Sequence, residues 1–162
     1  MVNRDFRDLF AEFNERNVRF LIVGAYALAV HGHVRATKDL DVWVKADKDN
    51  ARSVFRALQA YGAPTDELSE DDFATPGLTF QIGVAPIRID VLSSIDGVEF
   101  DDAWANRVTT TYGDQSVCVI SRDDLITHKR TAARLQDLAD VEALETLIDR
   151  DRRLDFNFEL QH

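Results

Sequence analysis

The segment from Asp39 to Lys45 constrains the fold most, because its side chains alternate between two kinds. Every second residue is apolar and would face one side of a β-strand: Leu40, Val42 and Val44. The other side would carry Asp39 and Asp41, followed by Trp43 and Lys45. Successive side chains of a strand point to opposite faces. The pattern therefore predicts a strand with one face in a core and two carboxylates on the other.

Helical and strand patterns alternate along the rest of the chain. Apolar residues at helical spacing predict helices at 4–16, 25–31, 48–61, 100–107 and from Ser121 to Ile148. Short apolar or alternating runs predict strands at 20–23, 39–45, 78–82, 87–92, 108–112 and 115–120. This order predicts an α+β fold, with helices packed against one mixed β-sheet and a C-terminal helical segment. We expect a single domain over residues 1–162, with 121–150 as its helical C-terminal part.

Asp39 and Asp41 form the first candidate site. Residues two apart on a strand lie on one face with Cα atoms about 6–7 Å apart, so two carboxylates can converge on a cation. Mg²⁺ takes oxygen ligands, often one or two carboxylates together with phosphate oxygens and water. The alternative is a solvated strand face that carries two acids.

Asp90 adds a third carboxylate from the predicted strand at 87–92. The apolar residues of that strand take the opposite face, which leaves Asp90 and Arg88 on one side. Asp90 is therefore either a further metal ligand or the partner of Arg88 in an ion pair.

Gly24 ends the apolar run at 20–23 where the next predicted helix begins. A helix N-terminus presents backbone N–H groups to an anion, and glycine lets a phosphate approach the backbone closely. The turn is a candidate phosphate site, with an ordinary strand-to-helix turn as the alternative.

The charge of the chain limits its partners. The formal net charge is −10, from 19 Lys and Arg against 29 Asp and Glu. This balance argues against bulk non-specific binding to nucleic acid, which needs dense Lys and Arg, and it suits a Mg²⁺ site. The single cysteine, Cys118, excludes a disulfide within the chain and a cysteine-type zinc site. With no signal peptide and no apolar run of membrane-spanning length, we expect a cytoplasmic protein without a membrane partner.

These motifs together resemble the polymerase-β-like nucleotidyltransferase superfamily. Its signature is a strand, a Gly-Gly or Gly-Ser turn, Asp-x-Asp or Asp-x-Glu on the next strand, and a third carboxylate on a later strand. Here Gly24-Ala25 is followed after thirteen residues by Asp39-Leu40-Asp41, and later by Asp90.

Part of this region is particularly similar to the small bacterial branch of the superfamily that is related to AbiEii-type toxins. The similarity lies in His31-Gly32, Arg35, Thr37 and the Asp-x-Asp block, and it extends more loosely over about residues 18–145.

The resemblance implies both a site and a reaction. Asp39, Asp41 and Asp90 would be catalytic and would hold Mg²⁺, or Mn²⁺ in its place. A nucleoside triphosphate would be bound by Gly24, Ala25, Arg35, Thr37, Lys38 and Lys129. A nucleoside monophosphate would pass to a hydroxyl group of an RNA, a protein or a small molecule, and pyrophosphate would leave.

Ala25 stands where the superfamily usually has Gly or Ser. This departure favours an alternative function, a catalytically weakened module that binds a nucleotide or a partner. One component of a toxin–antitoxin pair, with a small protein partner, is an example. A further alternative is a structural domain with an acidic face.

The basic residues also have structural alternatives. Arg35 is close enough in sequence to pair with Asp39, and Lys129, on a helix near Asp124, is alternatively a solvated or paired lysine. Two further acids of the last predicted helix, Asp137 and Asp140, are expected to hold helices together or to pair with Arg134.

Overall fold

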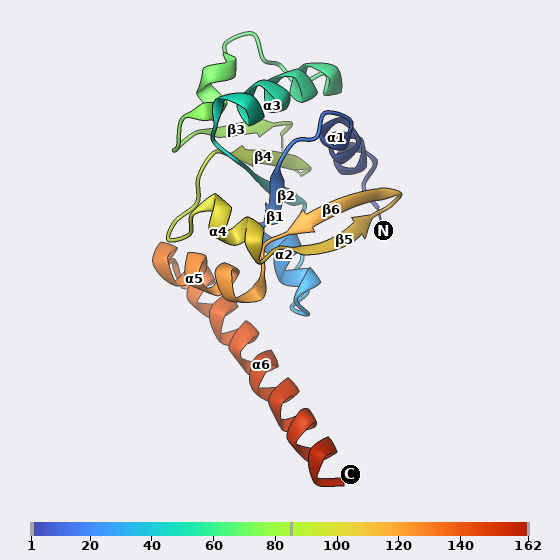
Figure 1. Ribbon diagram of the computed structural model, residues 1–162, viewed down its shortest axis with the longest axis vertical. Coiled ribbons are helices and arrows are strands. Elements are labelled where there is room, and N and C mark those ends of the chain that lie inside the picture. The colour runs from blue at the N-terminus through green and yellow to red at the C-terminus, as the bar shows by residue number, and fades with distance from the viewer. Residues whose placement is uncertain (1, 85, 162) are drawn as a thin grey trace.

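Within residues 2–84 and 86–161, which the computed structural model describes, six strands form one mixed sheet (Figure 1). The strands are β1 (Phe20–Val23), β2 (Asp39–Val44), β3 (Thr79–Ile82), β4 (Arg88–Leu92), β5 (Val108–Tyr112) and β6 (Gln115–Val119). They lie in the order β3-β4-β2-β1-β6-β5. The pairs β1–β6 and β2–β4 are parallel, and the other neighbours are antiparallel.

Helices pack against both faces of this sheet (Figure 1). They are α1 (Arg4–Glu15), α2 (Gly24–Val30), α3 (Lys48–Tyr61), α4 (Phe100–Ala105), α5 (Arg122–Ala132) and α6 (Leu135–Gln161), with a 3₁₀ helix, η1 (Glu70–Ala74). The predicted α+β fold with a mixed sheet is confirmed.

One face of the sheet carries the main apolar core. Leu40, Val42 and Val44 of β2 are fully buried on this face, as the alternation predicts. Helices α1 and α3 cover it, and Phe10 of α1 stacks on Phe20 of β1 with ring centroids 5.7 Å apart. Burial of each such side chain contributes about 1.5–3 kcal/mol, which fixes the apolar side of the strand inward.

The opposite face of the sheet is shared between a helix and an open region. Trp43 lies on the side of Asp39 and Asp41, yet it is only 2% exposed. Phe100 of α4 packs edge-on against it, with ring centroids 5.0 Å apart. Asp39 and Asp41 precede this contact and stay partly exposed, so β2 presents its acids beside a packed helix.

The ends of α3 follow the signals in the sequence. The Asp47 carboxylate accepts a hydrogen bond from the backbone N–H of Asn50, and Gly62 ends the helix in a left-handed conformation with φ of 94°. These two groups satisfy backbone polar groups that a helix end would otherwise leave unpaired.

The helical pattern predicted from Ser121 to Ile148 is confirmed, and the structure divides it into two helices at a break that the sequence did not locate. Ala133 adopts a left-handed conformation with φ of 55° between α5 and α6. The Asp137 carboxylate accepts hydrogen bonds from the backbone N–H and the Nε of Arg134, which holds the turn. Neither alanine nor arginine is a usual helix stop, so the sequence gives little warning of this break.

Helix α6 also runs further than predicted. It spans 27 residues and continues to Gln161, where its last turns project from the rest of the molecule (Figure 1). In the described part of the chain, no helix combines the length and the apolar character needed to cross a bilayer.

Replacing Ala133 by glycine should stabilise the protein by about 0.5–1 kcal/mol, because glycine adopts a left-handed conformation without the penalty from Cβ. Ala139→Gly, in the exposed interior of α6, is the matched control and should cost about 1 kcal/mol. Urea unfolding curves measure both changes. Destabilisation by Ala133→Gly would contradict the left-handed turn.

Candidate active site

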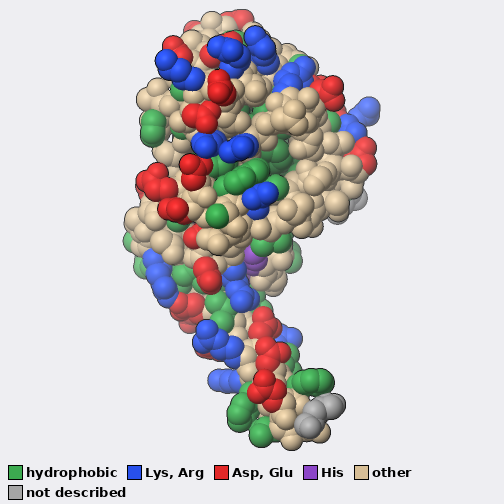
Figure 2. Space-filling view, viewed as in Figure 1, with side chains coloured by type: hydrophobic (Ala, Val, Ile, Leu, Met, Phe, Trp, Pro, Cys, Tyr) green, Lys and Arg blue, Asp and Glu red, His purple; other side chains and the backbone are tan. Residues whose placement is uncertain are grey.

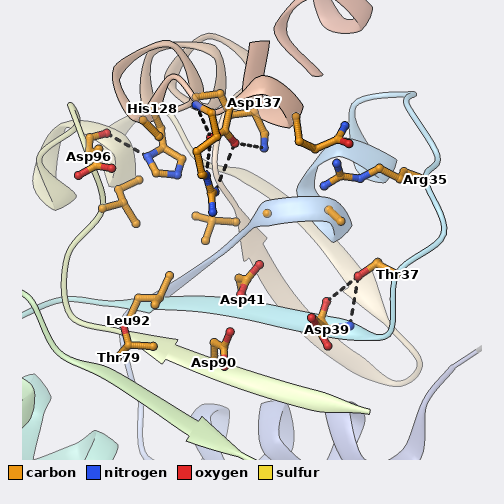
Figure 3. Close-up of a pocket in the computed structure, with 18 of the residues that line it drawn as sticks. Arg35, Thr37, Asp39, Asp41, Thr79, Asp90, Leu92, Asp96, His128 and Asp137 are labelled. Atoms are coloured by element: carbon orange, nitrogen blue, oxygen red, sulfur yellow. Dashed lines mark hydrogen bonds and ion pairs between the residues drawn. The ribbon is translucent and has the colours of Figure 1, made fainter. Parts of the chain in front are cut away.

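The three predicted carboxylates lie on adjacent strands at the floor of a cleft (Figure 3). In the parallel pair β2–β4, Asp41 lies opposite Asp90 and Asp39 lies opposite Arg88. Opposite residues of paired strands share a face, so the three acids and Arg88 all point away from the apolar core. The structure thus brings together residues that are about fifty positions apart in the chain.

Gly24 lies directly against Asp41. The backbone of Gly24 has φ of 71°, and a Cβ placed on it would lie 2.2 Å from Asp41 Oδ2. Val23, which precedes this turn, is the antiparallel partner of Asp41. Only a residue without a side chain leaves room for this carboxylate, so Gly24 is required where β1 turns into α2.

Arg88 is the cation nearest to the acids. Its Nη2 lies 3.3 Å from Asp39 Oδ2, and its Nε lies 3.4 Å from Asp90 Oδ1. The ion pair of Asp90 with Arg88 is therefore present, and Asp39 shares the same guanidinium. As the side chains stand, no three His, Cys, Asp or Glu residues within 2–84 and 86–161 form a cluster that could hold a metal ion.

Among the three acids, Asp41 is the one whose negative charge is least compensated by a nearby positive charge. Burial raises its pKa from 3.8 to about 6, and repulsion from Asp90 and then Asp39 adds to the shift. Arg88 and Lys129 oppose the shift from a distance without cancelling it. A positive charge next to Asp41 would therefore lower this pKa and stabilise the ionised carboxylate.

The helical wall of the cleft contains a buried ion network. Lys129 of α5 is 4% exposed, and its Nζ lies 3.0 Å from Asp140 Oδ2 and 3.4 Å from Asp137 Oδ1. In the loop before β2, the Nη1 of Arg35 lies 3.3 Å from Asp140 Oδ2. The Nε of Arg134 lies 2.7 Å from Asp137 Oδ2. The expected pairing of Asp137 with Arg134 is confirmed.

One expected partner is wrong. Arg35 pairs with Asp140 and not with Asp39, because the loop before β2 runs beside α6. The paired alternative for Lys129 is confirmed, and its partners are the acids of α6, since the turn at Ala133 folds α6 back against α5.

Most of the predicted nucleotide-binding residues line the cleft, which has a volume of about 720 Å³: Gly24, Ala25, Arg35, Thr37 and Lys129. Ala25 lines the cleft although the residue as a whole is buried. Thr37 Oγ1 accepts a hydrogen bond from the backbone N–H of Asp39 at 3.1 Å, which fixes the start of β2.

Lys38 is the predicted site residue that the structure places elsewhere. The segment before β2 is extended, and burial alternates along it. Arg35 and Thr37 are partly buried toward the cleft, whereas Lys38 is exposed and is not among the lining residues. Because residues of an extended chain alternate between two sides, Thr37 and Lys38 cannot both face the cleft.

Several lining residues were not recognised from the sequence. They include Thr79 from β3, Asp96 from the loop after β4, and His128, Ala132 and Gln136 from the two helices. The His128 Nδ1 lies 3.0 Å from the backbone oxygen of Asp96, which ties the loop to α5. The alternation of β3 could have predicted that Thr79 faces the cleft. The position of Gln136 could not be predicted in this way, because it depends on the helix break at Ala133.

The sequence itself matches one protein family. Residues 2–157 match a family described as "Nucleotidyltransferase of unknown function (DUF6036)". The chain belongs to this family of nucleotidyltransferases. The predicted superfamily is thereby confirmed, whereas the closer resemblance to AbiEii-type toxins remains a prediction. No curated protein matches the sequence.

Solved nucleotidyltransferase structures share the fold of this chain. The lincosamide antibiotic adenylyltransferase LnuA, in its lincomycin-bound form, is 14% identical with a TM-score of 0.55, over 89% of this chain and 97% of that one. A putative nucleotidyltransferase from Thermotoga maritima, TM1012, is 12% identical with a TM-score of 0.57, over 93% and 96%. The antibiotic-resistance factor ANT(2'')-Ia is 14% identical with a TM-score of 0.54, over 98% and 96%.

Gly24→Ala should destabilise this nucleotidyltransferase by more than about 2 kcal/mol, because a left-handed alanine alone costs about 1–2 kcal/mol and the Cβ also displaces Asp41. Gly77→Ala is the matched control, since Gly77 has φ of 94° but open space around a Cβ. Denaturant unfolding should show a smaller loss for Gly24→Ala in an Asp41→Ala background. Equal losses at Gly24 and Gly77 would disprove the close contact.

Asp41→Asn should stabilise the fold above neutral pH. The raised pKa of about 6 means that folding is favoured while Asp41 is protonated, and this contribution is lost as the pH rises from about 4 through 6. An asparagine at this position does not titrate, so the variant does not lose stability over this range. Its free energy of unfolding should equal that of the wild type at pH 4 and exceed it by about 2–3 kcal/mol above pH 7.

Melting temperatures at several pH values in metal-free buffer measure this difference. Asp66→Asn, on an exposed loop, is the control and should follow the wild type throughout. An advantage of Asp41→Asn that did not change with pH would rule out the titration of Asp41 as its cause.

Proposed function

We propose that the protein transfers a nucleoside monophosphate from a nucleoside triphosphate to a hydroxyl group of an acceptor, with a divalent cation, Mg²⁺ or Mn²⁺. One observation carries this proposal: three carboxylates of two adjacent strands line one cleft floor, and one of them, Asp41, lies against a glycine turn. Membership of the nucleotidyltransferase family supports the reaction class.

The residues of the floor fit a hard divalent cation. Asp39, Asp41 and Asp90 supply oxygen ligands, which Mg²⁺ and Mn²⁺ prefer. The pKa of Asp41 is raised mainly by burial and then by repulsion from Asp90 and Asp39, so a cation at the same place would stabilise the ionised carboxylate. Arg88 would have to turn aside. Its side chain is 34% exposed, and its contacts of 3.3–3.4 Å are long enough to exchange.

A cation held at the floor would stabilise the negative charge that develops in the transfer. The residues of the chain have the remaining roles. Asp39 and Asp41 would hold the cation from one strand, and Asp90 faces them from the next and would accept the proton of the acceptor hydroxyl. Because Asp90 is 13% exposed, it can still be reached by a substrate in the cleft.

The triphosphate would lie between the glycine turn and the helical wall. Gly24 and Ala25 offer backbone N–H groups, and Arg35 and Lys129 bring positive charge to the cleft. Both of these side chains already neutralise Asp140, so their effect on a phosphate is reduced. Arg134 is also paired, with Asp137, but its side chain is 77% exposed at the rim, so it is better placed for direct contact, and we add it to the phosphate-binding set.

The acceptor is proposed only by class. A cleft of about 720 Å³ falls in the range of small-molecule sites, about 300–1,000 Å³. The structural relative LnuA is an antibiotic adenylyltransferase solved with lincomycin, which favours a small-molecule hydroxyl as acceptor. RNA and protein hydroxyl groups are the other acceptors to be tested, and we place the reaction in the cytoplasm.

Transfer can be tested with each α-labelled triphosphate, Mg²⁺ and three acceptor pools: total RNA, total protein and a set of hydroxyl-bearing small molecules that includes lincomycin. We expect label in one pool with release of pyrophosphate. Asp90→Asn should reduce the rate by about a hundredfold or more, because charge stabilisation is the main catalytic term. Asp66→Asn should not change it.

Metal binding is tested separately by the melting temperature. Mg²⁺ with a non-hydrolysable triphosphate should raise it for the wild type, and less for Asp41→Asn. Absence of both transfer and thermal shift would refute the proposed function.

A second candidate function is a module that binds the triphosphate without turnover, alone or as one half of a toxin–antitoxin pair. The buried side chain of Ala25 favours it, because Ala25 lacks the hydroxyl that a serine there would offer to the triphosphate. Calorimetry separates the two functions. Binding of a triphosphate with Mg²⁺ and no pyrophosphate release from any acceptor pool would support the module.

A further inference from the structure

The last residues of α6 have a sequence pattern that does not suit a helix. From Leu154 to Gln161 large apolar residues alternate strictly with polar ones. The apolar members are Leu154, Phe156, Phe158 and Leu160, and each is 59–70% exposed. Strict alternation over eight residues is the pattern of a β-strand with one buried face.

Helical geometry divides these apolar residues between two sides. Residues two apart on a helix lie about 200° apart around its axis. Leu154 and Phe158 therefore point to one side, and Phe156 and Leu160 point to the other. Figure 2 shows apolar side chains on both sides of the tip of this helix. In a strand, all four would share one face.

The helical state of this segment has little support from tertiary packing. Residues 151–161 are all exposed, and the segment projects from the body of the molecule (Figure 1). The exposed end of a helix opens at a low cost in free energy. Converting this segment to another conformation therefore uncovers little buried surface.

The sheet has an edge that matches this segment. β5 is the last strand in the order of the sheet, and its sequence is Val-Thr-Thr-Thr-Tyr. All of these residues favour strands, and none is a lysine or proline of the kind that protects an edge. Within the described residues, no strand pairs with its outer side.

The two-residue turn between β5 and β6 indicates which backbone N–H and C=O groups of β5 point away from β6. Tyr112 pairs with Gln115 next to the turn, and alternate residues of β5 pair with β6 from there. Thr109 and Thr111 are the intervening residues, and both are exposed. Their backbone N–H and C=O groups point outward and can pair with an added strand.

We propose that residues 154–160 of one copy add to the outer edge of β5 of a second copy as an antiparallel strand. With Phe158 opposite Thr110, Phe156 faces Tyr112 and Leu160 faces Val108, so the apolar residues extend the face covered by α1. Aromatic and apolar pairs of this kind stabilise adjacent strands. Asn157 and Glu159 then pair through their backbones with Thr111 and Thr109.

The antiparallel register places Glu159 diagonal to Arg107 at the start of β5, where opposite charges attract. Asp155 then lies opposite Gly113 and next to Asp114, where like charges repel. Charge alone therefore does not fix the direction of the added strand.

A second copy is the occupant because a single copy keeps the two elements apart. Arg122 of α5 pairs with Asp151 at 3.5 Å, which holds the base of the tail, and α6 then leads away from β5 (Figure 1). Two copies can exchange tails reciprocally, which gives a closed dimer with two identical contacts.

The edge is tested by sedimentation of the full chain over a range of protein concentrations. We expect a reversible dimer. Thr111→Pro removes an outward N–H without affecting the β6 ladder and should weaken dimerisation by more than about tenfold. Thr111→Val keeps the N–H and should dimerise as the wild type does. A chain that is monomeric throughout, or a Thr111→Pro variant that dimerises normally while its melting temperature is unchanged, would overturn the proposal.

The conformation of the tail is tested by two further variants. Leu154→Ser and Phe156→Ser lie on opposite sides of a helix but on one face of a strand. Strand addition predicts that each weakens the dimer by a similar factor. A dimer weakened by only one of them would show that the tails pair as helices. In the same samples, the Thr109 and Thr111 amides should exchange hydrogen more slowly at high protein concentration, and no change would also count against strand addition.

Discussion

The parallel pairing of β2 with β4 is the constraint on which the site depends. It places Asp41 opposite Asp90 on one face, while Leu40, Val42 and Val44 are buried on the other. A slip of either strand by one residue would turn its acids into the apolar core beneath α1 and α3. The energy of apolar burial therefore holds the register, and the register in turn holds three like charges together.

The C-terminal helices contribute to the cleft through charge. Lys129, Asp137 and Asp140 are almost completely buried, so each needs its partners to offset the loss of hydration. Arg35 and Gln136 complete the surroundings of Asp140, at 3.3 and 3.0 Å. This network joins α5 and α6 to the loop that leads into β2, and thereby fixes the wall of the cleft relative to its floor.

Local patterns were sufficient to predict much of this architecture. Alternation identified β2 and the shared face of Asp39 and Asp41, and Asp47 and Gly62 marked the ends of α3. The same rule of alternation, applied to residues 33–38, would have turned Lys38 outward. What local patterns could not supply was the pairing between distant segments. Arg88 reaches Asp39 only because β4 lies beside β2, and no residue near either strand encodes that neighbourhood.

The helix break at Ala133 shows another limit. Nothing in the sequence indicates that a non-glycine residue adopts a left-handed conformation. The free energy that this conformation costs is offset by contacts that form only in the folded protein. Those contacts include the hydrogen bonds of Arg134 to Asp137, which are visible in the sequence only as two charged residues three positions apart.

Arg88 gives the carboxylates of the floor an internal counter-ion. In the proposed function, uptake of a divalent cation would be an exchange, in which the metal replaces a guanidinium and not only water. The displaced guanidinium would stay tethered to β4 beside the entering phosphates, as one more positive group in contact with them. Metal and triphosphate would consequently bind cooperatively, each increasing the affinity of the protein for the other.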